Sequence, residues 1–200
     1  MTTLLAAACL CAGAAAPAAA SADVPLPPLP PVPAPPALPP TPSVPACANA
    51  TIAVSARTTA RVDAAVLCLL NAQRAAHGLP PLSANRSLRH AASSFAHAMV
   101  RHRFFAHVSP GGSTPASRVA HTSYLRGAST WALGEDIAWG SGTDATPAAI
   151  VAAWMASAPH RRNILEPSFR DVGIGVRRGA PARGVRGGAT YVADFGARTR

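Results

Sequence analysis

Two neighbouring stretches decide how this chain folds: Ser157-Ala158-Pro159-His160-Arg161-Arg162-Asn163-Ile164-Leu165 and Asp171-Val172-Gly173-Ile174-Gly175-Val176. The first closes a helical region, because Pro159 ends a helix that opens with Thr146 as its cap and Pro147 at its first position. The second alternates apolar residues with other residues, two of them glycine, which is the pattern of a strand. The boundary between helices and strands therefore falls between these two stretches.

Helices are predicted before this boundary and mainly strands after it. Apolar residues recur at helical spacing over residues 63–77 and 87–101. Strands are predicted over residues 131–138, 171–177 and 189–195, and the Gly- and Arg-rich residues 178–188 would join the last two as an antiparallel hairpin. Helices followed by strands indicate an α+β fold rather than an alternating α/β fold.

The composition limits how the core can be built. The chain is rich in alanine and only 5% aromatic, so the core must consist largely of small side chains. A domain of about 150 residues can still bury roughly 70% of its unfolded surface, enough for a core without metal or disulfide support. We expect Trp131, Trp139 and Trp154 to contribute to that core.

The charge is strongly positive and comes from arginine alone. The formal net charge is +10, with eighteen arginines and no lysine. A phosphate-binding P-loop and Schiff-base chemistry both require lysine, so both classes are excluded. Arginine binds phosphate and carboxylate at two points, and the positive balance favours an anionic partner such as envelope polymer, lipid head groups or nucleic acid. The alternative is that the arginines reflect genome composition and serve only solubility.

The first 46 residues are predicted to lie outside the folded domain. Residues 4–20 are almost wholly apolar, and Ala20-Ser21-Ala22 fits a small-residue cleavage pattern, so residues 1–22 are predicted to be a signal peptide. The apolar run is short for a stable membrane span, and no positive residue precedes it. A lipid anchor through Cys9 or Cys11 is the weaker alternative.

Residues 23–46 are half proline, which predicts an extended, semi-rigid linker. Recognition by a proline-binding partner is the alternative interpretation of this segment. The folded domain would then comprise residues 47–200 of a protein that is secreted, with association to the cell surface left open.

The cysteine count predicts one disulfide in that domain. Cleavage after Ala22 would remove Cys9 and Cys11 and leave Cys47 and Cys68. Two cysteines in an oxidising compartment most simply form one bridge. It would join the end of the linker to the first helix and close a loop of about twenty residues, which is worth about 3 kcal/mol in the chain-entropy model.

Two histidines and one glutamate are the residues that could carry chemistry. His107, Glu135 and His160 each stand beside a turn or the end of an element. Neutral imidazoles and a carboxylate are ligands that zinc accepts. No local motif such as H-E-x-x-H is present, so ordinary hydrogen bonding by each histidine is the alternative. The remaining histidines are interpreted as structural or exposed: His77, His90, His97, His102 and His121.

These residues belong to motifs that follow one another in a definite order. Phe104-Phe105-Ala106-His107-Val108-Ser109-Pro110 and Gly134-Glu135-Asp136-Ile137-Ala138 precede the two stretches quoted above. An Asn71-x-x-Arg74 pair comes before them all, and Asp194-Phe195-Gly196 comes last. In these motifs and their order the chain resembles the CAP superfamily, the cysteine-rich secretory, antigen 5 and pathogenesis-related (SCP-like) proteins, in its bacterial cysteine-poor form. The resemblance covers roughly residues 63–196.

The resemblance implies a three-layer α-β-α sandwich with a central antiparallel sheet. It also implies a cleft that is lined, in many members, by two histidines and two acidic residues. By position, these are His107, His160 and Glu135, and the second acid falls near Ser157, where this chain has serine. The expected ligand-binding cleft is therefore His107, Glu135, Ser157 and His160, with His107, His160 and Glu135 as candidate metal ligands. The missing carboxylate leaves less negative charge to hold a divalent ion, and Asp136 is expected to point away from Glu135.

The resemblance implies no single reaction. We expect a non-enzymatic extracellular binding module, with no catalytic residues and no required cofactor, whose cleft takes a small ligand or a divalent ion such as zinc. Its arginine surface and linker would hold it at an anionic lipid or wall polymer of the envelope, and nucleic acid is not the expected partner. The alternative is a metal-dependent hydrolase of peptide, wall polymer or nucleic acid, with Glu135 as ligand or general base. That alternative lacks a fourth ligand and has no G-x-S-x-G nucleophile.

Overall fold

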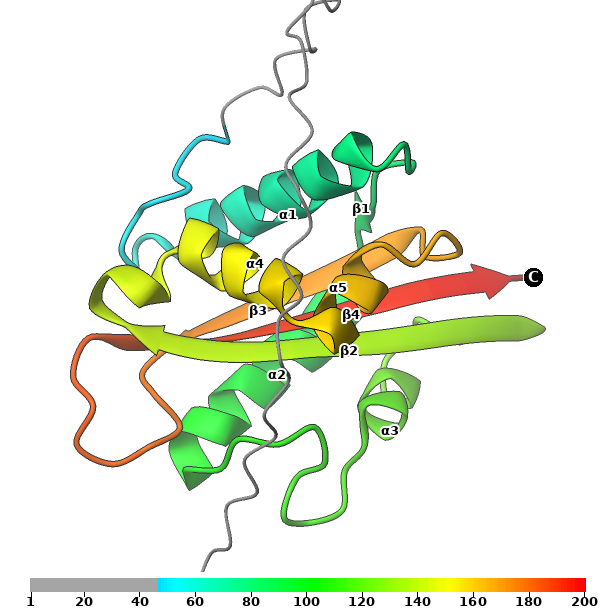
Figure 1. Ribbon diagram of the computed structural model, residues 1–200. Helices are drawn as coiled ribbons and strands as arrows, with labels where there is room; N and C mark the ends of the chain where they lie inside the picture. The colour runs from blue at the N-terminus through cyan, green and yellow to red at the C-terminus, as the bar shows by residue number, and fades with distance from the viewer. Residues whose placement is uncertain (1–46) are drawn as a thin grey trace, which may run out of the picture. The chain divides into compact units, whose positions relative to one another are not determined.

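The computed structural model of this chain describes residues 47–200 (Figure 1). The predicted signal peptide, 1–22, and the predicted linker, 23–46, lie outside the described residues. One sheet lies between two layers of helices, with strand order β1-β3-β4-β2. The elements are α1 Thr59–Ala76, β1 Ser83–Ala84, α2 Arg86–His102, α3 Pro115–Ala120, β2 Thr130–Ser141, the 3-10 helix η1 Gly142–Ala145, α4 Pro147–Ala156, α5 Ala158–Ile164, β3 Asp171–Arg178 and β4 Gly188–Thr199.

The sheet is antiparallel apart from its shortest strand. β4 pairs antiparallel with β2 along its whole length and with β3 over residues 171–178. β1 adds two residues that pair parallel with the start of β3. The predicted α+β class and three-layer α-β-α sandwich are confirmed.

Helices cover both faces of the sheet. Figure 1 shows α1, α4 and α5 over one face and α2 and α3 over the other. Successive strand residues point to opposite faces, so Tyr191 and Phe195 pack in the core beneath α1 and α4, whereas Val192 packs against α2. Glu135 and Asp194, which are opposite each other on β2 and β4, therefore lie on the α2 side.

The two glycines of the 171–176 stretch are required by packing. A side chain on Gly173 would collide with the backbone of Leu88 and Arg89, and one on Gly175 would collide with the backbone of Ala92 and Ser93. Helix α2 can therefore lie directly on β3. The alternation of apolar residues with glycine predicted the strand, and the structure shows that the two glycines leave room for the helix backbone.

The Asn71-x-x-Arg74 pair has a structural role. Asn71 exchanges two hydrogen bonds with the backbone of Leu82, Nδ2 to O at 3.0 Å and Oδ1 from N at 2.8 Å. The fully buried Arg74 guanidinium donates to four backbone carbonyls, those of Pro80, Ile164, Glu166 and Phe169, at 2.8–3.3 Å. Burial lowers the pKa of Arg74. This side chain ties α1 to the segment between α5 and β3.

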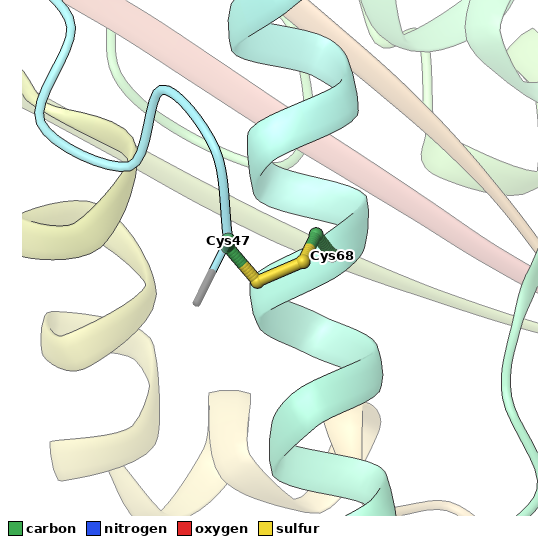
Figure 2. Close-up of a disulfide and its surroundings, with 2 residues drawn as sticks. All are labelled: Cys47 and Cys68. Carbon is green, nitrogen blue, oxygen red and sulfur yellow. A yellow bond between two sulfur atoms is a disulfide. The ribbon is translucent and has the colours of Figure 1, made fainter. Parts of the chain in front are cut away.

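The predicted disulfide between Cys47 and Cys68 is confirmed (Figure 2). It joins the start of the described chain to the middle of α1, with a Cα–Cα distance of 5.7 Å. Within residues 47–200, no helix combines the length and apolar character that crossing a membrane would require.

One prediction about the core is wrong. Trp154 is buried, at 1% exposure, but Trp131 and Trp139 are 52% and 38% exposed. Both exposed tryptophans lie near the ends of β2, which is an edge strand of the sheet, and the core is completed by smaller residues and by Tyr124, Tyr191 and Phe195 instead.

Candidate functional site

Glu135 is the buried centre of the region that the sequence singled out. Its side chain, 2% exposed, projects from β2 on the α2 side of the sheet. His107, in the segment between α2 and α3, places Nδ1 2.7 Å from Glu135 Oε1. Arg118 of α3 donates from Nη2 to the other oxygen, Oε2. Both carboxylate oxygens are therefore held by side chains from outside the sheet.

The start of α3 positions Arg118. Thr114 and Ser117 form a capping box with Pro115 in the first turn, which fixes the direction of this short helix. The Arg118 guanidinium also donates to the carbonyls of Ser113, at 2.8 Å, and His107, at 3.1 Å. Its Cζ lies 3.3 Å from the centre of the Phe95 ring, a cation–π contact with α2. Arg118 thus holds the segment that carries His107 against the sheet.

A second carboxyl group lies beside Glu135. Asp194 is its cross-strand partner on β4 and is 2% exposed. Neither Asp194 oxygen has a geometric hydrogen-bond partner within residues 47–200. Burial, together with the negative charge of Glu135, holds the pKa of Asp194 well above its usual range. Burial therefore favours the neutral form of Asp194 more than it would for an exposed aspartate.

Asp136 lies on the opposite face, as expected for the residue next to Glu135 in a strand. Asn163 of α5 donates from Nδ2 to Asp136 Oδ1 at 2.7 Å and to the Glu135 carbonyl at 3.3 Å. Burial raises the pKa of Asp136 to about 7, although the bond from Asn163 acts in the other direction. Residues 135 and 136 therefore connect β2 to α3 on one side and to α5 on the other.

The two histidines differ in environment. The His107 side chain is half exposed, and its hydrogen bond to Glu135 raises its pKa. His160, in α5, has its Nδ1 buried without a partner among the described residues. Burial, and to a smaller extent the charge of His107, lowers the pKa of His160. The two imidazoles are thus near enough to interact electrostatically.

Ser157 does not join this group. It is the extended residue between α4 and α5, and its side chain does not cap α5. Of the four residues expected in the cleft, the structure brings His107 and Glu135 into contact, places His160 within electrostatic reach of His107, and leaves Ser157 at the junction of two helices.

An open groove of about 470 Å³ lies beside His107 and Glu135. Its wall includes the half-exposed ring of Trp131 and the side chain of Asn163. Its lining residues are His107, Thr114, Pro115, Ala116, Trp131, Leu133, Gly134, Glu135 and Asn163. We call this hollow the β2 groove. It combines apolar surface with hydrogen-bonding groups, and neither Ser157 nor His160 lines it.

The candidate metal ligands are partly engaged in hydrogen bonds. Each oxygen of Glu135 already accepts one such bond, from His107 or from Arg118, and a metal ion at Glu135 would compete with them. Catalytic zinc sites use three protein ligands and an open position. No cluster of three His, Cys, Asp or Glu side chains within residues 47–200 is arranged to hold a metal ion. Zinc binding by His107, His160 and Glu135 stays a prediction.

Sequence reasoning missed the residues that hold Glu135 in place. Asn163 and Asp194 stand inside two of the quoted motifs but received no role. Arg118 lies in no motif, and its pairing with a carboxylate 17 positions away depends on the fold. The only local signal was Thr114-Pro115, a helix start that would have predicted α3.

Comparison of sequences identifies relatives. The model of the cysteine-rich secretory protein (CAP) family matches residues 67–195. The uncharacterized protein YkwD of Bacillus subtilis (strain 168) is 36% identical over 110 residues, which make up 55% of this chain and 40% of YkwD. This chain thus matches less than half the length of that relative.

Comparison of structures identifies the same fold. An extracellular SCP-domain protein of Bacillus anthracis str. Ames matches with a TM-score of 0.54 and 22% identity, over 71% of this chain and 43% of that one. An outer surface protein of Borrelia burgdorferi gives 0.53 and 20%, over 65% and 87% of the two chains. A cysteine-rich secretory protein of Staphylococcus aureus subsp. aureus Mu50 gives 0.51 and 17%, over 70% and 40%. With its motifs, its α-β-α fold and a family match over residues 67–195, the chain belongs to the cysteine-rich secretory protein (CAP) family.

Proposed function

We propose that this protein is a non-enzymatic binding module that acts outside the cell, at the envelope, and takes a small ligand in the β2 groove. The observation that carries the proposal is the hydrogen bonding of Glu135: His107 and Arg118 each bind one of its oxygens beside an open groove. This carboxylate serves to position the groove wall.

The same geometry disfavours hydrolysis. A general base needs an oxygen free to accept a proton from water or substrate. Each oxygen of Glu135 already accepts one hydrogen bond, from His107 or from Arg118, so water or substrate would have to share an oxygen with one of these donors. Arg118 is itself 9% exposed and held by two carbonyls. The metal-dependent hydrolase, with Glu135 as ligand or general base, is therefore the less favoured alternative.

The lining of the groove indicates the class of ligand. Trp131 offers a flat apolar ring that is half exposed, and Leu133 and Pro115 extend this surface. His107, Thr114 and Asn163 supply hydrogen-bonding groups around it. A saccharide unit of a wall polymer has a matching chemistry, because its C–H face can pack on an aromatic ring while its hydroxyl and amide groups bond at the edges. Pairs of aromatic side chains contribute about 0.5–1.5 kcal/mol beyond area burial, and we expect a contact of similar size here.

An extracellular location is supported by three observations. The chain carries a predicted signal peptide, and its Cys47–Cys68 disulfide is of a type that persists in oxidising compartments. Structural relatives from Bacillus anthracis and Borrelia burgdorferi are described as an extracellular protein and an outer surface protein.

Calorimetric titration with N-acetylated glycan fragments of the cell wall tests the proposal. Trp131→Ala is expected to weaken binding about 3- to 10-fold, in line with the energy of an aromatic contact. Trp139→Ala is the matched control, since this exposed tryptophan lies at the other end of β2 and outside the groove. No binding by the wild-type protein, or equal losses in both variants, would overturn the saccharide proposal.

A zinc titration tests the remaining prediction for the same site. Zinc binding that disappears in His107→Ala/His160→Ala, together with zinc-dependent cleavage of wall fragments, would instead favour the metal-dependent hydrolase. Zinc binding without cleavage would leave the binding module with an ion in its cleft.

A further inference from the structure

A second, larger hollow lies at the other end of the sheet. It has a volume of about 810 Å³ and is formed where β3 ends and β4 begins, beside the first turn of α1. Figure 1 shows the loop between β3 and β4 at the end of the sheet opposite to the C-terminus. The lining residues are Ser55, Ala56, Thr59, Val176, Arg177, Arg178, Gly179, Val185, Arg186, Gly187 and Gly188. We call this hollow the hairpin groove; the function proposed above does not use it.

The base of the hairpin groove is held by backbone bonds. Gly179 N donates to Gly188 O at 2.6 Å, and Thr190 Oγ1 donates to Gly179 O at 2.8 Å. Gly179 and Gly187 have φ values of +118° and +66°, which favour glycine over other residues. The arginines next to these glycines are therefore attached to a defined backbone.

The charge in this groove is entirely positive. Arg177, Arg178 and Arg186 are exposed, and no acidic residue lines the hollow. None of the three forms an ion pair or a side-chain hydrogen bond within residues 47–200. Helix α1 begins at Thr59 on the groove wall without a side-chain cap. The positive end of the helix dipole thus adds to the arginine charge. All of these groups are available to an anion.

The shape and composition of the groove select among anions. Guanidinium groups match phosphate with two-point geometry. The lining contains no aromatic side chain on which nucleobases could stack. A hollow fits a single extended chain better than the flat surface of a bilayer. We propose that the hairpin groove binds the phosphate groups of a polymer without nucleobases, of the polyol-phosphate or phosphorylated-glycan class. This would hold the protein at its site of action while the β2 groove stays free.

The test is a binding titration of the full secreted chain with short-chain inorganic polyphosphate across a salt series. The groove variant is Arg177→Ala/Arg178→Ala/Arg186→Ala. The control variant, Arg126→Ala/Arg162→Ala/Arg200→Ala, removes the same charge from exposed arginines outside the groove. Circular dichroism of each variant checks that the fold is retained, and Arg→Gln at the same three groove positions serves as a replacement if it is not.

The groove variant is expected to bind about tenfold or more weakly at low salt. The slope of log affinity against log salt concentration should become less steep by roughly two, because each phosphate contact contributes about 0.7–0.9 to its magnitude. The control variant should keep most of the affinity. Equal losses in the two variants would show that the net charge acts without a site, and would overturn the proposal.

Two further probes test the choice of polymer. A single-stranded oligonucleotide or vesicles of anionic phospholipid that bind more tightly than polyphosphate, with the same dependence on the groove arginines, would overturn the assignment to a polymer without bases. If the groove variant loses polyphosphate binding but still binds saccharide in the β2 groove, the result supports phosphate binding in the hairpin groove independently of the proposed function.

Discussion

The two grooves differ in how their polar groups are held. In the β2 groove, Glu135 is buried and bound by two side chains, with Asp194 beside it. In the hairpin groove, Arg177, Arg178 and Arg186 are exposed and have no side-chain partner within residues 47–200. The polar residues of the first groove therefore belong to the fold as much as to the site. Those of the second can be changed without disturbing the fold, so loss of binding there is easier to interpret.

The largest expected effect is that of Arg118→Ala. It would leave Glu135 buried without its main cation, so we expect the free energy of unfolding to fall by about 3–5 kcal/mol. Arg177→Ala in the hairpin groove removes the same side chain from an exposed position and should change it by no more than about 0.5 kcal/mol. Urea denaturation at neutral pH measures both. Similar losses of unfolding free energy in the two variants would show that the polar groups of the two grooves do not differ in their importance for the fold.

A smaller effect is expected for Asp136→Asn, and it depends on pH. Because burial raises the pKa of Asp136 to about 7, the folded state binds this proton more tightly than the unfolded chain does. The associated stability is complete below the unfolded pKa of about 3.9 and is lost as the pH rises through about 7. Near pH 8 the substitution removes about 4 kcal/mol of the cost of burying the Asp136 charge. It also leaves the new amide N–H₂ group without a hydrogen-bond partner, which costs about 1–3 kcal/mol. The variant should therefore be more stable than the wild-type protein by about 2 kcal/mol.

Thermal unfolding between about pH 4 and pH 8 measures this difference. The exposed Asp144 of η1 supplies a control, Asp144→Asn, which makes the same substitution at the surface. A wild-type profile that does not decline towards pH 8 would contradict the assignment.

The smallest expected effect is a shift in the titration of His107. Its hydrogen bond to Glu135 raises its pKa, so proton NMR should show it titrating above about 6.5, the usual value. Its contribution to stability is present below that usual value and is lost as the pH rises through the raised pKa. Glu135→Gln should return the pKa towards 6.5. A His107 resonance that is insensitive to this substitution would mean that the two side chains do not pair in solution.

Elements with a local pattern were predicted well. The ranges 63–77 and 87–101 correspond to α1 and α2, and 171–177 and 189–195 to β3 and β4. The structure extends α1 back to Thr59 and β4 on to Thr199, since element ends depend on contacts outside the pattern. Helix α3 and strand β1 were missed because six and two residues are too few to show a period, and β1 exists only through its pairing with β3.

The site was harder to predict than the fold. The disulfide could be predicted by counting, since cleavage of the predicted signal peptide would leave only Cys47 and Cys68. The pairing of His107 with Glu135 required the motifs of a family, because 28 residues separate them and no local rule joins such positions. Neither local sequence patterns nor the family motifs pointed to Arg118. The tryptophans of β2 were placed in the core by their size alone, whereas their positions near the ends of an edge strand leave them exposed.

The disulfide also decides how the domain would respond to a mechanical load. Any pulling force applied to the chain ahead of Cys47 would cross the sulfur–sulfur bond and enter α1 at Cys68. Residues 48–67, including the first turns of α1, would then carry none of that tension (Figure 2). After reduction of the disulfide, the same force would act directly on those turns of α1 and could separate them from the sheet. The oxidation state of one bond would therefore set the mechanical strength of the domain, and it would also decide whether Ser55, Ala56 and Thr59, which line the hairpin groove, are exposed to that load.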